Sequence, residues 1–197
     1  MTTGYRINVP DLSLDGQLYG QCPVQGEGRI AGYYFYFRAR GAHWTCAAYF
    51  DLANPEPSHF AGLEPDAHDQ LFEVDGVSGY VHCGDYGSNF DAGYMPYEDA
   101  EYFVRIFARD FLTKLQERSA LQHEHRRRLL ALERLAEESI SAMYDAIHPT
   151  NATGHYSNAK EALHDAIGLA RQIGDGPTAE RLSRRLADIK ATFRSQF

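Results

Sequence analysis

The aromatic run from Gly32 to Phe50, GYYFYFRARGAHWTCAAYF, constrains the fold more than any other stretch of the chain. Strand residues alternate between two faces, and this run alternates on both sides of Arg40-Gly41, where glycine permits a tight turn. We therefore predict a β-hairpin. One face of the hairpin is almost wholly apolar and is expected in the core: Tyr33, Phe35, Phe37, Trp44, Cys46, Ala48 and Phe50.

The opposite face of the predicted hairpin is amphipathic. Tyrosine and arginine combine a large contact area with a polar group, which suits a binding surface. Tyrosine is also simply a good strand residue, so the same face could be half covered by a neighbouring loop. The candidate binding residues on this face are Tyr34, Tyr36, Arg38, His43 and Tyr49.

Charge divides the chain into two parts. The net charge is −8 over 197 residues, yet residues 1–95 hold 12 acids, four arginines and no lysine, whereas residues 96–197 hold 15 acids and 15 bases. This split predicts an acidic β-rich domain over 1–95 and a helical domain over 96–197. Direct nucleic-acid binding is not expected, because phosphate contacts need Lys and Arg.

Shorter signals fill out the predicted β-rich domain as an antiparallel meander. Gln17 to Val24 is a candidate strand, and Gly26-Glu27-Gly28 is interpreted as a turn. Leu71 to Val74 and Val77 to Cys83 are further candidate strands on either side of Asp75-Gly76, a hairpin turn signal.

A helical region begins at Pro96, because proline suits the first turn of a helix. No glycine or proline occurs from Tyr97 to His148. Phe103 to Leu115 carries an aromatic stripe at helical spacing, which we expect to cover one side of the sheet. Gln116 to Arg128 is polar nearly all round, so 97–148 is either one continuous helix or two helices with a break near Ser119 to His125.

The end of the chain is predicted to form a helical hairpin over 155–196. Its run ALHDAIGLARQIGDGPTAERLSRRL resembles a helical hairpin of the tetratricopeptide type in its small residues and its Gly-Asp turn. One hairpin cannot form a solenoid, which needs several repeats. We therefore expect a three-helix bundle in which the hairpin packs on the apolar stripe of Leu129 to Ile147, which includes Leu135. Overall, the sequence predicts an α+β protein.

The usual signatures of catalysis and of metal binding are absent from the sequence. GxGxxG after a strand, GxxxxGK[ST], GxSxG and HExxH are all missing. His82, Cys83 and Asp85, with His59, His68 and Asp69, match no zinc spacing, so neither a metal nor another cofactor is expected. A cysteine nucleophile would need Cys46 or Cys83 beside a histidine, which sequence alone cannot place.

Basic residues cluster in the middle of the long helical region, at Arg126, Arg127 and Arg128 beside His123 and His125. Such a run is typical of a solvated helix face. The alternative is a contact for an acidic partner, including the acidic half of a second copy.

These observations favour a non-enzymatic protein-interaction module that associates with itself through its helices. In a narrower form of this hypothesis, the acidic domain mimics nucleic acid and blocks a basic groove on a partner. The alternative class is a small enzyme or small-molecule binder that uses the tyrosine-rich face or the loop from His82 to Asp85. Three scattered cysteines, no signal peptide and no long apolar run predict a cytoplasmic protein without a membrane span.

Overall fold

The computed structural model of the chain describes residues 4–52, 55, 57–60, 69–74, 76–88 and 90–196. Two compact units make up the chain, a first unit over Met1–Glu117 and a second unit over Arg118–Phe197. The long helix α1, Tyr97–Tyr144, contributes its first part to the first unit and the remainder to the second. The sequence-based domain assignment of 1–95 and 96–197 follows the change in composition. The boundary between the two compact units instead falls inside α1.

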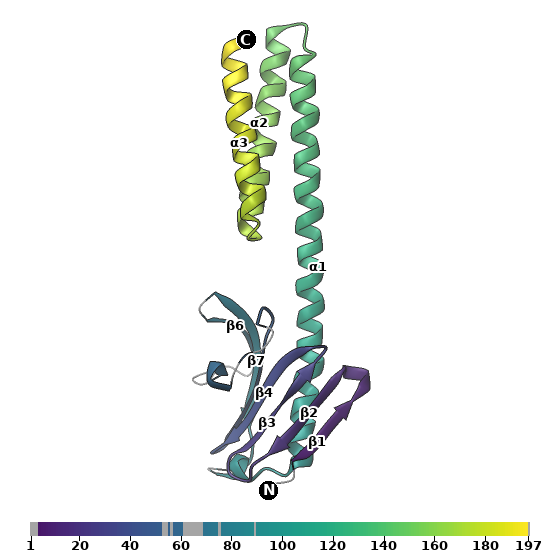
Figure 1. The fold of residues 1–197 in the computed structure, drawn as a ribbon, viewed down its shortest axis with the longest axis vertical. Helices are drawn as coiled ribbons and strands as arrows, with labels where there is room; N and C mark the ends of the chain where they lie inside the picture. The colour runs from purple at the N-terminus through teal and green to yellow at the C-terminus, as the bar shows by residue number, and fades with distance from the viewer. Residues whose placement is uncertain are drawn as a thin grey trace. The chain divides into compact units, whose positions relative to one another are not determined.

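The first unit is built on one seven-stranded antiparallel sheet with the order β1-β2-β3-β4-β5-β7-β6 (Figure 1). A long helix and two further helices follow the sheet along the chain, so the predicted α+β class is confirmed. The strands are β1 Tyr5–Val9, β2 Leu14–Tyr19, β3 Val24–Ile30, β4 Tyr33–Arg40, β5 His43–Tyr49, β6 Asp69–Val74 and β7 Val77–Asp85. Short 3₁₀ turns lie at η1 Pro10–Leu12, η2 Pro57–Phe60 and η3 Asp91–Tyr94.

The predicted hairpin is β4 and β5, and its two faces are as expected. Phe35 pairs with Ala48 and Phe37 pairs with Cys46 on one face, while Tyr36 pairs with Ala47 on the other. We call the face that carries Phe35 and Phe37 the inner face and the face that carries Tyr34 and Tyr36 the outer face. The first five strands form a meander, but β7 pairs with β5 and places β6 at the edge of the sheet.

Two predictions about the early strands were wrong. Gln17 to Val24 is the end of β2, a connection and the start of β3, while Gly26 to Gly28 lies inside β3 rather than in a turn. The physical reason is packing on the inner face. A Cβ on Gly26 would lie 2.5 Å from Leu18 Cδ2, and one on Gly28 would lie 2.9 Å from Phe35 Cε1. Glycine here makes room for large neighbours, a role that looks the same as a turn signal in sequence.

The first part of α1 seals the inner face. Val104, Phe107 and Phe111 are fully buried in one cluster with inner-face residues of the sheet. The Phe103 ring stacks on Trp44 with centroids 4.5 Å apart, and the Phe111 ring stacks on Phe50 at 5.2 Å. The prediction that the aromatic stripe covers one side of the sheet is therefore confirmed.

The second unit is a bundle of the later part of α1 with α2 Pro149–Gln172 and α3 Gly176–Gln196. Its core contains Leu129 and Ile140 of α1, Leu163 of α2, and Leu182 and Ile189 of α3. No described helix contains a stretch long and apolar enough to cross a membrane.

The helix boundaries differ from the prediction at the junction of α1 and α2. The region over 97–148 is one helix, and it ends at Tyr144 rather than near His148. His148 precedes a proline and is extended, with φ −114° and ψ 136°, because proline disfavours the helical region for the residue before it. The helix α2 then begins at Pro149, six residues before the predicted start, since proline is favoured at the first helical position.

Two residues of the predicted stripe on the second half of α1 are not in the core. Leu135 is 49% exposed and Ile147 is 90% exposed. Ile147 lies beyond the end of the helix, so the helical spacing that linked it to Met143 does not apply to it.

Candidate functional site

Three of the predicted binding residues on the outer face are packed around one phenylalanine. The ring of Phe60, in η2, has its centroid 6.0 Å from that of Tyr34, 5.6 Å from Tyr36 and 5.2 Å from Tyr49. Tyr49 is only 2% exposed, and its hydroxyl donates a hydrogen bond to the His59 carbonyl at 2.9 Å. Much of the tyrosine surface therefore contributes to packing, while Tyr34 and Tyr36 keep part of their surface open.

The other two predicted binding residues on this face are exposed. Arg38 of β4 pairs with Thr45 of β5 and projects toward solvent. His43 Nδ1 lies 2.7 Å from Asp85 Oδ1 across the pair of β5 and β7, and both side chains are more than two-thirds exposed. A contact this open contributes little to stability, so both residues are available for contact.

A shallow pocket of about 620 Å³ opens on the outer face over the first four strands. Of the five predicted binding residues, Tyr34 lines this pocket. The peptide backbones of Gly16 and Gly28, which are paired in register, form part of its lining. The side chains around it are mostly charged or polar. The lining residues are Gly4, Arg6, Asp15, Gly16, Gln17, Glu27, Gly28, Arg29 and Tyr34.

Glu27 is fixed in this pocket by two uncharged donors. The Tyr34 hydroxyl donates to Glu27 Oε2 at 2.7 Å, and Gln17 Nε2 donates to Glu27 Oε1 at 3.3 Å. Burial and then the hydrogen bond to Glu27 raise the pKa of Tyr34 above its ordinary value of 10.0. Tyr34 therefore remains a hydroxyl donor throughout the physiological range of pH.

The remaining charges of the pocket include two arginines and an aspartate. Arg6 Nη2 lies 3.6 Å from Asp15 Oδ1, with both side chains well exposed. Arg29 donates to the Gly32 carbonyl at 2.7 Å, which directs one of its guanidinium nitrogens toward the turn between β3 and β4. The pocket therefore presents charges of both signs, and it is wide open to solvent.

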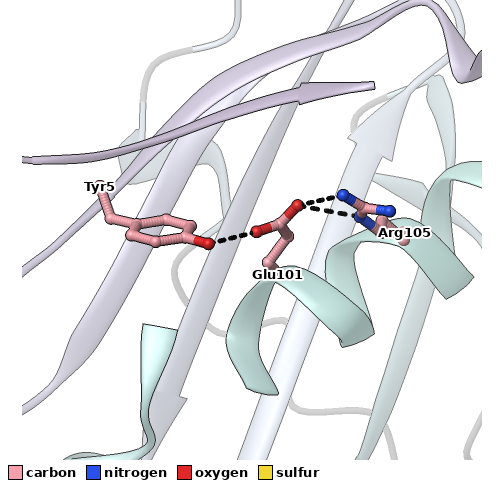
Figure 2. Close-up of polar contacts among 3 residues, drawn as sticks. All are labelled: Tyr5, Glu101 and Arg105. Carbon is pink, nitrogen blue, oxygen red and sulfur yellow. Dashed lines mark hydrogen bonds and ion pairs between the residues drawn. The ribbon is translucent and has the colours of Figure 1, made fainter. Parts of the chain in front are cut away.

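A second polar cluster connects the sheet to α1 and is structural. Figure 2 shows Glu101 of α1 between Tyr5 of β1 and Arg105 of α1. The Tyr5 hydroxyl donates to Glu101 Oε2 at 2.7 Å, and Arg105 Nε donates to Glu101 Oε1 at 2.9 Å. Burial raises the pKa of Glu101, but the hydrogen bonds from Tyr5 and Arg105 outweigh it, so that the pKa lies below its ordinary value. The cluster contributes to closing the inner face.

Of the cysteine and histidine candidates, Cys46 and His82 are packed in the interior of the first unit. Cys46 is fully buried, and burial raises the pKa of its thiol, which opposes formation of a nucleophilic thiolate. His82 lies between Trp44, 5.1 Å away between ring centroids, and Asp110 of α1, whose Oδ2 is 3.4 Å from His82 Nδ1. In the described part of the chain, no three His, Cys, Asp or Glu side chains form a group that could hold a metal ion. The candidate His68 lies outside the described residues.

The basic residues Arg126, Arg127 and Arg128 are exposed on the part of α1 that belongs to the second unit. Arg127 forms an ion pair with Glu124 one turn away on the same helix. Arg126 is one of the charges that lower the pKa of Asp175, at the turn between α2 and α3, after the hydrogen bonds from Thr178.

Most of the pocket residues were missed by reading the sequence. Arg6, Asp15, Gln17, Glu27 and Arg29 come from three strands, of which β1 was not predicted and β3 was interpreted in part as a turn. A signal was present in the alternation of Asp15 with Gln17 and of Glu27 with Arg29, because both pairs occupy every second position and share a strand face.

Comparison of the chain with protein-family models, with curated proteins and with solved structures found no match.

Proposed function

We propose that the chain is a non-enzymatic protein-interaction module whose acidic first unit binds a basic surface of a partner protein through the outer face of the sheet. The observation that carries the proposal is the shallow, charged pocket on that face. Since α1 and the residues beneath it seal the inner face, the outer face is the side of the sheet that a partner can reach.

The shape and lining of the pocket favour a protein over a small molecule. Sites for small molecules are concave and mostly apolar, with a few placed polar groups. Here the pocket is open, and arginine, aspartate, glutamate and glutamine side chains supply most of its walls. Charged side chains at the rim of an interface guide encounter and select the partner.

Net charge indicates the sign of the partner. Residues 1–117 contain 17 acids and seven lysines and arginines, so the first unit has a formal charge of −10, whereas the second unit has a formal charge of +2. A field of this sign attracts cationic surfaces and repels phosphate backbones. A basic protein surface, including a groove that otherwise binds nucleic acid, fits this charge.

Photo-crosslinking tests this proposal. In one variant, expressed in cells of the native host, a photoreactive phenylalanine analogue replaces Arg38 on the outer face. In a second variant it replaces Glu180, an exposed residue of α3, as the matched control. We expect a covalent adduct with a second, basic protein from position 38 and little from position 180. Absence of any adduct at position 38, or equal adducts at both positions, would contradict the proposal.

Self-association through the helices is a second candidate, favoured by apolar side chains exposed on the later part of α1. Leu121 is 56% exposed, Leu130 66% and Tyr144 49%, and large apolar groups at a surface often mark contacts between proteins. Light scattering on the purified chain tests this candidate. A mass of two or more chains, reduced to one by Leu130→Glu, would support it, and a monomer at all concentrations would exclude it.

A further inference from the structure

Glu27 differs from the other carboxylates of the outer face in the kind of partner that holds it. Asp15 has Arg6 close by, and Asp85 has His43. Glu27 is half-buried and accepts hydrogen bonds from Tyr34 and Gln17. No lysine, arginine or histidine among the described residues forms an ion pair with it.

The negative field of Glu27 reaches the neighbouring tyrosines. Burial raises the pKa of both Tyr19 and Tyr36, and in each case the charge of Glu27 adds to the shift, while the charge of Arg38 opposes the shift of Tyr36. The Glu27 carboxylate is therefore positioned by two uncharged donors and forms no ion pair with a described cation.

We propose that the Glu27 pocket is a receptor for a single arginine side chain of the partner. This inference rests on the proposed function and names the group that the outer face recognises. An ionised carboxylate offers about four lone-pair positions. The two hydrogen bonds use one position on each oxygen of Glu27, which leaves one acceptor position on each oxygen of a side chain that lines the pocket.

That remaining pair of acceptors matches the planar fork of a guanidinium. Arginine binds a carboxylate through two parallel hydrogen bonds, whereas the lysine ammonium is a compact point charge that does not use both oxygens in this way. Tyr34 and Gln17 each donate a hydrogen bond to the Glu27 carboxylate before the ligand arrives. A pocket of about 620 Å³ also leaves room for the arginine stem and for flanking backbone of the partner.

The experiment uses two short peptides and the isotope-labelled full chain. Acetyl-Gly-Arg-Gly-amide is titrated while the backbone amide resonances are followed by NMR, and the same peptide with citrulline in place of arginine is the neutral control of equal shape. We expect the arginine peptide to shift the amides of Gly16, Glu27 and Gly28 in a saturable manner. The citrulline peptide should bind at least fivefold more weakly.

Two variants of the chain test which carboxylate binds the arginine peptide. Glu27→Gln keeps an acceptor for Tyr34 but removes the charge, and we expect at least a fivefold loss of affinity. Glu73→Gln, an exposed acid on β6, is the matched control and should bind as the wild type does. Equal binding of both peptides to the wild type would overturn the inference, and this result does not depend on how any variant folds. Unchanged binding by Glu27→Gln would overturn it as well.

The outcome can be separated from that of the proposed function. A crosslinked partner at position 38 without a response to the arginine peptide refutes the arginine receptor and leaves the interaction module standing. A saturable response that Glu27→Gln abolishes, with no protein crosslinked at position 38, supports the receptor chemistry and refutes the protein-interaction module.

Discussion

Single glycines determine how closely the strands and their neighbours pack in the first unit. A Cβ on Gly28 would lie 2.5 Å from Gly16 Cα and 2.9 Å from Phe35 Cε1, whereas a Cβ on Gly168 of α2 would meet nothing within 4 Å. Backbone and a buried aromatic ring cannot move aside at low cost. The two glycines therefore have opposite consequences when a methyl group is added.

We expect Gly28→Ala to lower the free energy of unfolding of the first unit by about 2–3 kcal/mol, as overpacking does. Gly168→Ala should stabilise the second unit by about 0.5–1 kcal/mol, because alanine is the better helix former. The fluorescence of Trp44, the single tryptophan, follows urea unfolding of the first unit, and circular dichroism at 222 nm follows the helices. A stabilising Gly28→Ala would show that β3 is not packed as described.

The contact between Tyr5 and Glu101 should depend on pH. Because the folded pKa of Glu101 is lowered from 4.5, its stabilising contribution is present above the unfolded value and is lost as the pH falls through the folded pKa. Tyr5→Phe should therefore lower the thermal midpoint at pH 7, and the difference from wild type should shrink as the pH falls below 4.5. Tyr102→Phe, at a position 60% exposed on α1, is the control and should leave the thermal midpoint unchanged at both pH 7 and low pH. A difference for Tyr5→Phe that stays constant from pH 7 to pH 3 would contradict the assignment.

Among the structural elements, the short turn η2 has a disproportionate effect on the outer face. Its Phe60 is 7% exposed and contacts three tyrosine rings. Phe60→Ala should cost about 3–4 kcal/mol, in the lower part of the range for buried aromatic residues, because the site lies at the sheet surface. Tyrosine fluorescence reports whether the three tyrosine rings become exposed, and urea unfolding gives the change in the free energy of unfolding. A loss below about 0.5 kcal/mol, as at an ordinary surface position, would mean that η2 does not hold the tyrosines.

Ion pairs connect α3 to the later part of α1 within the second unit. Arg185 donates to both oxygens of Glu137, at 2.8 and 2.6 Å, and Arg181 donates to Glu133 at 2.8 Å. Hydrogen bonding to Arg185 lowers the pKa of Glu137 despite some burial. The side chain of Arg185 is 39% exposed and that of Glu137 is 55% exposed, so the solvent screens much of this attraction.

A double-mutant cycle with Arg185→Met and Glu137→Gln should give a coupling of about 0.5–1 kcal/mol at low salt, near the upper end for exposed pairs because of the bidentate geometry. The coupling should be smaller in 1 M NaCl, because salt screens the attraction. It should also decrease when the pH is lowered far enough to protonate Glu137, whose pKa in the folded chain lies below its value in the unfolded chain. Helix unfolding at 222 nm is the measurement. Coupling that is insensitive to salt would point to packing of the arginine stem instead.

Features set by residues close together in the sequence were predicted correctly, whereas features set by residues far apart in the sequence were not. The faces of β4 and β5 follow from alternation within one run, and the stripe around Phe107 follows from helical spacing. The position of β6 at the edge depends on β7 pairing with β5, which local pattern does not encode. Gly26 and Gly28 were misinterpreted because their role is set by Leu18 and Phe35 across the sheet. The pocket was missed for the same reason, since Arg6, Asp15 and Glu27 meet only through strand register.

Across the chain, the division of charge matches the division into units. The sheet and the first part of α1 carry a formal charge of −10, and the bundle carries +2. Long-range attraction to a basic partner should therefore depend on the acids of the first unit as a group, while the outer face gives it direction. These two contributions can be separated, because some exposed acids of this unit lie away from the outer-face pocket.

The most direct test compares two pairs of acids on the same unit. The affinity for the partner identified by crosslinking would be measured with three forms of the chain. These are the wild type, an outer-face double variant with Asp15→Asn and Glu27→Gln, and a control double variant with Glu73→Gln and Glu98→Gln. Both double variants remove two charges. We predict that the outer-face pair weakens binding at least tenfold, a loss of about 1.4 kcal/mol, and that the other pair weakens it less than threefold. Equal losses would show that net charge alone carries the interaction and that the outer face of the sheet is not the contact surface.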